Sequence, residues 1–395
     1  MLLSLGLLLL VGLSMAGICQ KLKLPRIIGM LLCGVVLGPY VLDLLDSTIL
    51  NISTELRQIA LIIILIKAGL SLNISDLSQV GRSAVLMSFV PASFEILAYL
   101  IFAPLLLGIN LKEALLMGSV LAAVSPAVVV PYMIKLIDNG IGTKKSIPQL
   151  ILAGASCDDV FVIVLFTSFS AMVSGNQVHS NPIIEIILSI IFGILIGIVL
   201  GVLLSHIFEQ FYNKGKFIRN STKVIIFLAL SLLLLSLENL TQIPYSALLS
   251  VVSMACVYKI KTSPSLILDL SSKFGSIWIG AEILLFVLVG ASVNIHYLFS
   301  NFGLALIMIF IGLCIRCIGV LISLIGTKLN RKERIFCMFA YLPKATVQAA
   351  IGSIPLSLGL ECGSIILTVA VCSILITAPL GALLIDKTHN ILLKE

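Results

Sequence analysis

The sequence predicts an all-α polytopic membrane protein with about 13 transmembrane helices, and three observations support this prediction. Of its 395 residues, 59% are hydrophobic and 11% are charged, whereas a soluble domain carries roughly 25% charged residues. Apolar runs of about 20 residues, long enough to cross a hydrocarbon core roughly 30 Å thick, recur along the chain. The segments between them are too short for a separate soluble domain. We therefore expect a single transmembrane domain over residues 1–395, without an extramembrane enzyme module.

The order of the predicted spans is supported by the basic residues between them. The spans are residues 2–19, 25–43, 56–73, 82–107, 113–136, 147–174, 182–208, 222–238, 244–259, 276–295, 299–326, 334–357 and 362–385. Cytoplasmic loops collect Lys and Arg, and only Lys67, Arg316 and Lys344 lie well inside predicted spans. Of the other basic residues, Arg57 and Lys112 fall on one side of the membrane and all the rest on the opposite side. This asymmetry predicts an outside N-terminus and a cytoplasmic C-terminus, and it accounts for the net charge of +7 without nucleic acid.

Two predicted spans contain proline near their middle, beside small or hydroxylated residues. Residues 122–131 read A-A-V-S-P-A-V-V-V-P and include Pro126 and Pro131, and residues 340–352 read A-Y-L-P-K-A-T-V-Q-A-A-I-G and include Pro343. Proline removes a backbone donor and clashes with the preceding turn, so both helices are expected to unwind there. The two segments lie seven spans apart and should run in opposite directions. Such a pair indicates two discontinuous helices that cross at the binding site of a transporter built from inverted repeats; the alternative is two ordinary proline kinks.

Ionisable side chains are also predicted inside the membrane, where an ionised group costs at least about 2.5–3.5 kcal/mol and needs a partner or a role. They are Lys67, Glu95, Asp158, Asp159, Glu282, Arg316 and Lys344. Lys67 and Glu282 lie near the cytoplasmic ends of their spans. Lys67 can reach water by snorkelling, and Glu282 is expected either to pair with Arg316 or to reach water.

Asp158 and Asp159 lie near the middle of the span predicted over residues 147–174. Adjacent residues of a helix point about 100° apart, so one carboxylate can face the crossing of the discontinuous helices while the other faces a neighbouring helix. A low-dielectric site favours the protonated carboxyl over the carboxylate, and the carboxylate can instead bind a hard cation such as Na⁺ through oxygen. If one aspartate binds either H⁺ or Na⁺ but not both, alternating access exchanges the two ions.

Other residues of these segments are candidates for completing the ion site. Ser125, Thr346 and Gln348 are candidate auxiliary ligands, although a Ser or Thr hydroxyl in a helix also often bonds to its own backbone. Lys344 is expected to neutralise the meeting helix dipoles or to pair with Glu95. Arg316 is expected to act as a permanent structural cation, because arginine does not deprotonate in proteins.

Segments spread along the chain resemble the monovalent cation:proton antiporter superfamily. They are L-P-R-I-I-G-M-L-L-C-G-V-V-L-G-P (24–39), I-K-A-G-L-S-L (66–72), S-P-A-V-V-V-P (125–131), G-A-S-C-D-D (154–159) and L-P-K-A-T-V-Q-A-A-I-G (342–352), in the order expected of that superfamily. The paired aspartates and P-K-A-T-V-Q are similar to the antiporter-2 branch and its sodium/proton antiporters of the NHA type.

The resemblance implies a fold, an assembly and a carrier residue. A core domain with helices at about 82–174 and 299–385 would move against a dimerisation domain with helices at about 2–73 and 182–295, in a homodimer of the cell membrane. Asp159 would be the main carrier of Na⁺ (or Li⁺) and H⁺, assisted by Asp158. Electrogenic antiporters with paired aspartates often have lysine where this chain has Arg316, so the arginine indicates electroneutral exchange. Membrane lipid and a second copy are the expected partners, and neither a cofactor nor enzymatic activity is expected.

Three other functions are alternatives. An intramembrane aspartyl protease needs two aspartates on facing helices that share a proton, whereas Asp158 and Asp159 are adjacent on one helix. A Na⁺-coupled organic solute symporter needs a larger pocket with more polar recognition groups. The third alternative is a K⁺/H⁺ exchanger or K⁺-efflux system of the same superfamily, since one-dimensional spacing does not rank Na⁺, Li⁺ and K⁺.

Overall fold

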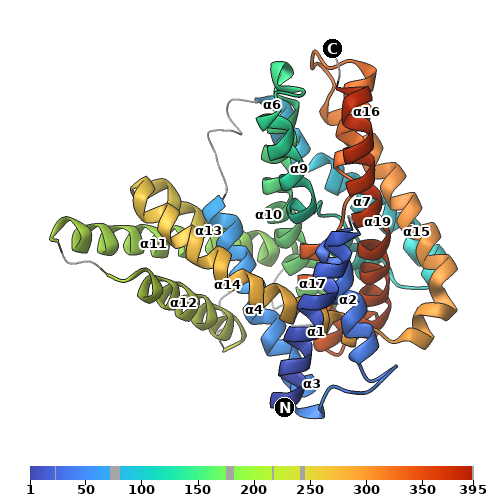
Figure 1. The fold of residues 1–395 in the computed structure, drawn as a ribbon, viewed down its shortest axis with the longest axis horizontal. Helices are drawn as coiled ribbons and strands as arrows, with labels where there is room; N and C mark the ends of the chain where they lie inside the picture. The colour runs from blue at the N-terminus through green and yellow to red at the C-terminus, as the bar shows by residue number, and fades with distance from the viewer. Residues whose placement is uncertain (23, 72–80, 175–181, 216–217, 241–244, 394–395) are drawn as a thin grey trace. The chain divides into compact units, whose positions relative to one another are not determined.

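The computed structural model describes residues 1–22, 24–71, 81–174, 182–215, 218–240 and 245–393. Every regular element within these ranges is a helix, as the sequence predicted (Figure 1). The helices are α1 (Leu2–Lys21), α2 (Arg26–Leu37), α3 (Ser47–Asn51), α4 (Ser53–Ser71), α6 (Arg82–Met87), α7 (Val90–Leu107), α8 (Leu111–Leu121), α9 (Pro126–Asp138), the 3-10 helix η1 (Thr143–Lys145), α10 (Ile147–Val173), α11 (Pro182–Asn213), α12 (Asn220–Leu240), α13 (Ala247–Lys261), α14 (Pro264–Ala291), α15 (Ile295–Ser323), α16 (Arg331–Ala340), α17 (Thr346–Gly352), α18 (Ile354–Ser357) and α19 (Gly363–Leu392).

Membrane-crossing helices are abundant in the described chain. By length and composition, 9 helical segments of the described residues can cross a bilayer, and Arg26–Leu37 is a shorter apolar helix. The predicted number of about 13 crossings includes α2, α4, α13 and the pair α16–α17, and it stays a prediction. The basic residues Lys23, Lys216 and Lys394, and the span end at 72–73, lie outside the described residues.

The chain divides into two compact units. The first comprises Met1–Thr54, Asn73–Ser174 and Leu285–Glu395, and the second comprises Glu55–Leu72 and Gly175–Leu284. The paired aspartates and both proline-containing segments belong to the first unit. This division follows contacts, and the predicted functional division into core and dimerisation domains remains a prediction.

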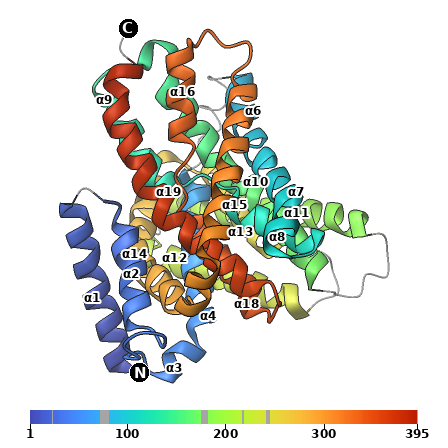
Figure 2. The ribbon, with the colours of Figure 1, turned by 90° about the vertical axis from the view of Figure 1, so that its right-hand side faces the viewer.

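Glycines allow close helix packing in both units. In the first unit, α1 lies beside α2 (Figure 2), and Gly34 and Gly290 bring α2 and the end of α14 together, since a Cβ on either would overlap a carbonyl of the other helix. In the second unit, Gly193, Gly197 and Gly201 form a stripe along α11 that packs against backbone and side-chain atoms of α13 and of Ser246 just before it. Small residues at such contacts let helix backbones approach closely in membranes.

We expect Gly290→Ala to destabilise the protein by about 1–3 kcal/mol, the usual cost of overpacking a dense interior. The added methyl group would overlap the backbone carbonyl of Leu31. The backbone of Leu31 can move away only if α2 is displaced. The measurement is thermal unfolding in detergent. Gly280→Ala is the matched control, because it lies on the same helix with open space around its Cβ position; equal destabilisation by both variants would contradict the packing argument.

Candidate functional site

Both proline-containing segments interrupt their helices. Residues 122–125 separate α8 from α9, and residues 341–345 separate α16 from α17. Pro126 is the first residue of α9, a position where its missing N–H has no intrahelical acceptor, and Pro343 lies inside the second break. The predicted break at Pro131 is wrong: this residue lies inside the continuous helix α9, where a proline removes only one bond from the ladder.

The two breaks contact each other. The backbone N–H of Ser125 donates to the carbonyl of Pro343 at 2.8 Å. The side-chain amide of Gln348 donates to the carbonyls of Ala123, at 2.6 Å, and Leu121, at 3.4 Å. Unwound backbone at membrane depth must be satisfied by protein or by a cavity, and here the breaks satisfy one another. The predicted meeting of two discontinuous helices is therefore correct.

Gln348 has both of its side-chain groups engaged. Its amide oxygen accepts from the N–H of Ala345 at 2.8 Å, while its nitrogen binds the first break as described. This side chain fixes the start of α17 against the end of α8, and backbone groups occupy both of its polar groups in place of an ion. The sequence suggested a ligand because it revealed the polar group but not its partners.

A buried network of four charged side chains lies beside the breaks. Oε2 of Glu95, on α7, accepts hydrogen bonds from two cations: Arg316 Nη1 at 2.8 Å and Lys344 Nζ at 2.5 Å. Arg316 of α15 also donates to Asp158 Oδ2 at 3.1 Å. All four side chains are at most 1% exposed. Two cations and two carboxylates thus balance one another, which buried charges require.

Arg316 also binds the backbone of both breaks. Its Nε donates to the carbonyl of Tyr341 at 2.8 Å, and its Nη1 donates to the carbonyl of Ala122. These two residues follow the last residues of α16 and α8, where the helix dipole is negative. The guanidinium therefore has the dipole-neutralising role that the sequence had suggested for Lys344, and Lys344 has the other predicted role, pairing with Glu95.

Of the two alternatives for Glu282, the pair with Arg316 is not formed. Arg316 pairs with Glu95 and Asp158, whereas Glu282 belongs to the second unit and lies near enough to Lys67 for the two charges to interact. Arg316 was suggested as a partner only from the membrane depth that the sequence predicts for the two residues. Depth does not reveal which way a side chain points around its helix.

Asp158 and Asp159 have different surroundings on α10. Asp158 is fully buried, and its Oδ2 accepts from the backbone N–H of Val124 at 2.7 Å as well as from Arg316. Asp159 is 8% exposed, and within the described residues its carboxylate has neither an ion pair nor a hydrogen bond. Asp158 is thus fixed in the network, whereas Asp159 has no partner in the part of the chain that the structure describes.

Several buried oxygen atoms of the two breaks and of α10 lack hydrogen-bond partners among the described residues. Among the described residues, the buried oxygens without a partner include Ser125 Oγ, Asp158 Oδ1, Asp159 Oδ1 and the hydroxyl of Tyr341. They come from the first break, α10 and the second break, which meet here. Buried polar atoms without protein partners indicate water or an ion, and a set of carboxylate and hydroxyl oxygens suits a hard cation.

Two site residues were missed by the sequence reasoning. Tyr341 packs against α10 at Gly154, one turn before Asp158, where a Cβ would overlap its hydroxyl; its position beside Pro343 in the break was the available signal. Thr377 of α19 accepts from the backbone N–H of Lys344 at 2.9 Å, and no local pattern distinguishes it. Thr346, a predicted ligand, is buried as the first residue of α17.

Comparison with known proteins identifies relatives of the whole chain. The family model described as "Sodium/hydrogen exchanger, transmembrane" matches residues 6–386. Sodium/hydrogen exchanger 9B2 of Homo sapiens is 34% identical over 387 residues, which cover 94% of this chain and 70% of that protein. Sodium/hydrogen exchanger 9B1 of Mus musculus is 34% identical over 374 residues, which cover 92% of this chain and 65% of that protein.

A solved structure shares the fold. The sodium proton antiporter MjNhaP1 from Methanocaldococcus jannaschii at pH 8 matches with a TM-score of 0.84 at 23% identity, over 99% of this chain and 98% of that one. This likeness supports the fold class predicted from the sequence, and the family model supports the superfamily suggested by the motifs. The chain therefore belongs to the transmembrane sodium/hydrogen exchanger family.

Proposed function

We propose that the protein exchanges Na⁺ for H⁺ across a membrane by alternating access, with the two ions competing for Asp159. The observation that carries this proposal is the free carboxylate of Asp159: it is buried on α10 and has no protein partner within the described residues, while the neighbouring buried charges are paired. A carboxylate in such a place must be neutralised, and either a proton or a monovalent cation does so. The names of the relatives, sodium/hydrogen exchanger and sodium proton antiporter, support this choice of ions.

The charge balance supports electroneutral exchange. Glu95 and Asp158 compensate Arg316 and Lys344, so this network carries no net charge when all four groups are ionised. Ionised Asp159 then adds a single negative charge, which one H⁺ or one Na⁺ neutralises. Because Arg316 stays protonated, we propose that one proton is exchanged for one Na⁺ or Li⁺.

Buried oxygens of α10 and of the two breaks would supply the ligands for the bound cation. We assign this role to Asp159, to the unpartnered Asp158 Oδ1 and to the hydroxyl of Ser125, with Tyr341 as an additional candidate. Thr346 stays a candidate because it begins α17 beside the second break. When the proton replaces the cation, these oxygens are free to bind water.

The finer features of the assembly belong to the same proposal. We propose a homodimer in the plasma membrane, with the N-terminus outside and the C-terminus in the cytoplasm, in agreement with the distribution of basic residues. The core helices would move against the dimerisation helices to expose the site alternately. Relatives that are named exchangers agree with a transport role rather than an enzymatic one.

Transport by the purified protein in liposomes tests this function. A pH gradient is imposed, Na⁺, Li⁺, K⁺ or choline is added in turn, and internal pH is followed with a trapped dye. We expect Na⁺ and Li⁺ to dissipate the gradient, at a rate that clamping the membrane potential with valinomycin and K⁺ leaves unchanged. Dissipation by K⁺ alone would favour the K⁺/H⁺ alternative, and a response no larger than that to choline would refute cation/proton exchange.

A further inference from the structure

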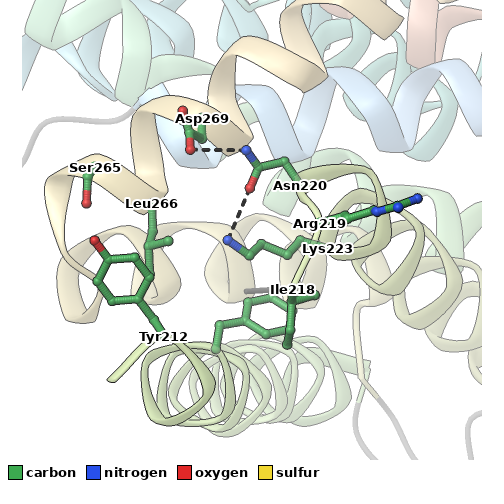
Figure 3. A pocket seen from close by; sticks show the side chains of 9 residues that line it. Tyr212, Ile218, Arg219, Asn220, Lys223, Ser265, Leu266 and Asp269 are labelled. Carbon is green, nitrogen blue, oxygen red and sulfur yellow. Dashed lines mark hydrogen bonds between the residues drawn. The ribbon is translucent and has the colours of Figure 1, made fainter. Parts of the chain in front are cut away.

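The second unit contains a cavity of about 310 Å³ at one end of its helices. Figure 3 shows the side chains that line it, from the end of α11, the start of α12 and the start of α14. The polar lining consists of Tyr212, Arg219, Asn220, Lys223, Ser265 and Asp269. The volume is that of a small-molecule site, and the exchange mechanism proposed above uses none of these residues.

Lys223 is the unusual group in this lining. It is only 3% exposed, yet its ammonium donates to the neutral side-chain oxygen of Asn220 at 3.1 Å, and no carboxylate of the described residues lies within ion-pair distance. The amide of Asn220 in turn donates to Asp269 Oδ2 at 3.0 Å (Figure 3). An ammonium has three donors, and a buried charge is costly until it is paired. The cavity beside Lys223 is where an anionic partner can bind.

Two helix N-termini add to the positive character of the cavity. Asn220 is the first residue of the 21-residue helix α12, and Ser265 is the second residue of the 28-residue helix α14. The first N–H groups of a helix lack intrahelical acceptors, and each N-terminus carries roughly half a positive charge. Arg219, which is exposed at the rim, contributes a full charge. The single carboxylate of Asp269 does not outweigh these groups.

We infer that this cavity binds a phosphate-bearing anion, with Lys223 contacting the phosphate oxygens and the exposed Arg219 contributing its positive charge from the edge of the site. Phosphate suits the site because it accepts several charge-assisted hydrogen bonds at once and because helix N-termini favour it. The loops that begin α12 and α14 lie on the side where the sequence places the cytoplasm. Basic pockets between membrane helices on that side bind anionic lipid headgroups, so the source is either such a headgroup or free phosphate.

Binding is measured with the purified full-length protein in detergent, as a shift of its thermal unfolding midpoint with ligand concentration. The probes are inorganic phosphate, phosphatidylglycerol and, as a zwitterionic control, phosphatidylcholine. We expect Arg219→Gln to weaken binding about fivefold, the effect of roughly 1 kcal/mol for one basic side chain, and Lys223→Met to weaken it at least as much. Asp269→Asn should strengthen binding, because it removes the carboxylate from the lining.

Lys273→Gln is the matched control, since it removes an exposed positive charge from α14 outside the cavity. A response to inorganic phosphate supports free phosphate as the ligand, and a response to phosphatidylglycerol alone supports a lipid headgroup. Equal responses to phosphatidylglycerol and phosphatidylcholine with none to phosphate would overturn the inference. So would equal losses in Arg219→Gln and Lys273→Gln. If Lys223→Met fails to fold, Arg219→Gln and Asp269→Asn, both at exposed positions, still decide the question through opposite signs.

Discussion

Asp159→Asn is expected to reduce cation-dependent proton movement to the level of protein-free liposomes while the protein stays folded. The amide has nearly the shape of the carboxyl group. At neutral pH, however, it neither binds a proton nor carries the negative charge that would balance a bound cation. Because Asp159 has no ion pair within the described residues, its neutralisation leaves no cation unpaired. Stability should therefore be unchanged or slightly higher, and transport and thermal unfolding are measured on the same preparation.

The matched control for this result is Asp138→Asn. Asp138 is exposed at the last residue of α9, so the same chemical change is made in water, and transport should persist. If the Asp159→Asn variant still exchanged Na⁺ for H⁺ at the wild-type rate, the assignment of Asp159 as the carrier would be refuted. Loss of transport together with loss of the folded state would point instead to a structural role for this carboxylate.

Glu95→Gln is expected to destabilise the protein by about 3–5 kcal/mol, the cost of leaving a buried charge without its partner. In the wild type, Glu95 Oε2 binds both Arg316 and Lys344, and Asp158 alone cannot balance two cations. The neutral amide retains the shape but loses the charge. The measurement is thermal or denaturant unfolding in detergent, compared with the wild type.

The double variant Glu95→Gln/Lys344→Met separates charge balance from packing. It restores one cation for one carboxylate, Arg316 with Asp158, and should recover a large part of the stability lost in Glu95→Gln. Lys135→Gln is the exposed control: both side chains of its pair with Asp386 are largely exposed, and such pairs contribute about 0.2–1 kcal/mol. A double variant that is no more stable than Glu95→Gln would contradict the charge argument.

Local chemistry in the sequence was sufficient to single out the candidate site. Pro126 and Pro343 interrupt their helices in the structure, because proline in a helix interior acts on its own backbone and on the preceding turn. Asp158 and Asp159 could be singled out because charge at membrane depth is costly wherever it occurs. These inferences need no knowledge of the rest of the fold.

The partners of the site residues could not be predicted in the same way. Arg316 reaches the carbonyl of Ala122, 194 residues away along the chain, and Gln348 reaches Ala123 across 225 residues. Such contacts depend on how the helices pack and on their rotation about their own axes. This is why Gln348 was expected to bind an ion, and why a pair between Glu282 and Arg316 was one of two alternatives. The prediction of a break at Pro131 was wrong for another reason: a single missing hydrogen bond can bend a helix without ending it.

The contacts of Arg316 have a mechanical consequence. One guanidinium joins α7 through Glu95, α10 through Asp158, and the ends of α8 and α16 through Ala122 and Tyr341. Local swinging of any one of these helices would break one of the contacts of this buried guanidinium, and lost partners of a buried charge are costly. We therefore expect the ion and its ligands to travel together as a rigid body, so that the barrier between the two sides of the membrane lies in the sliding of this body and not in rearrangement around the ion.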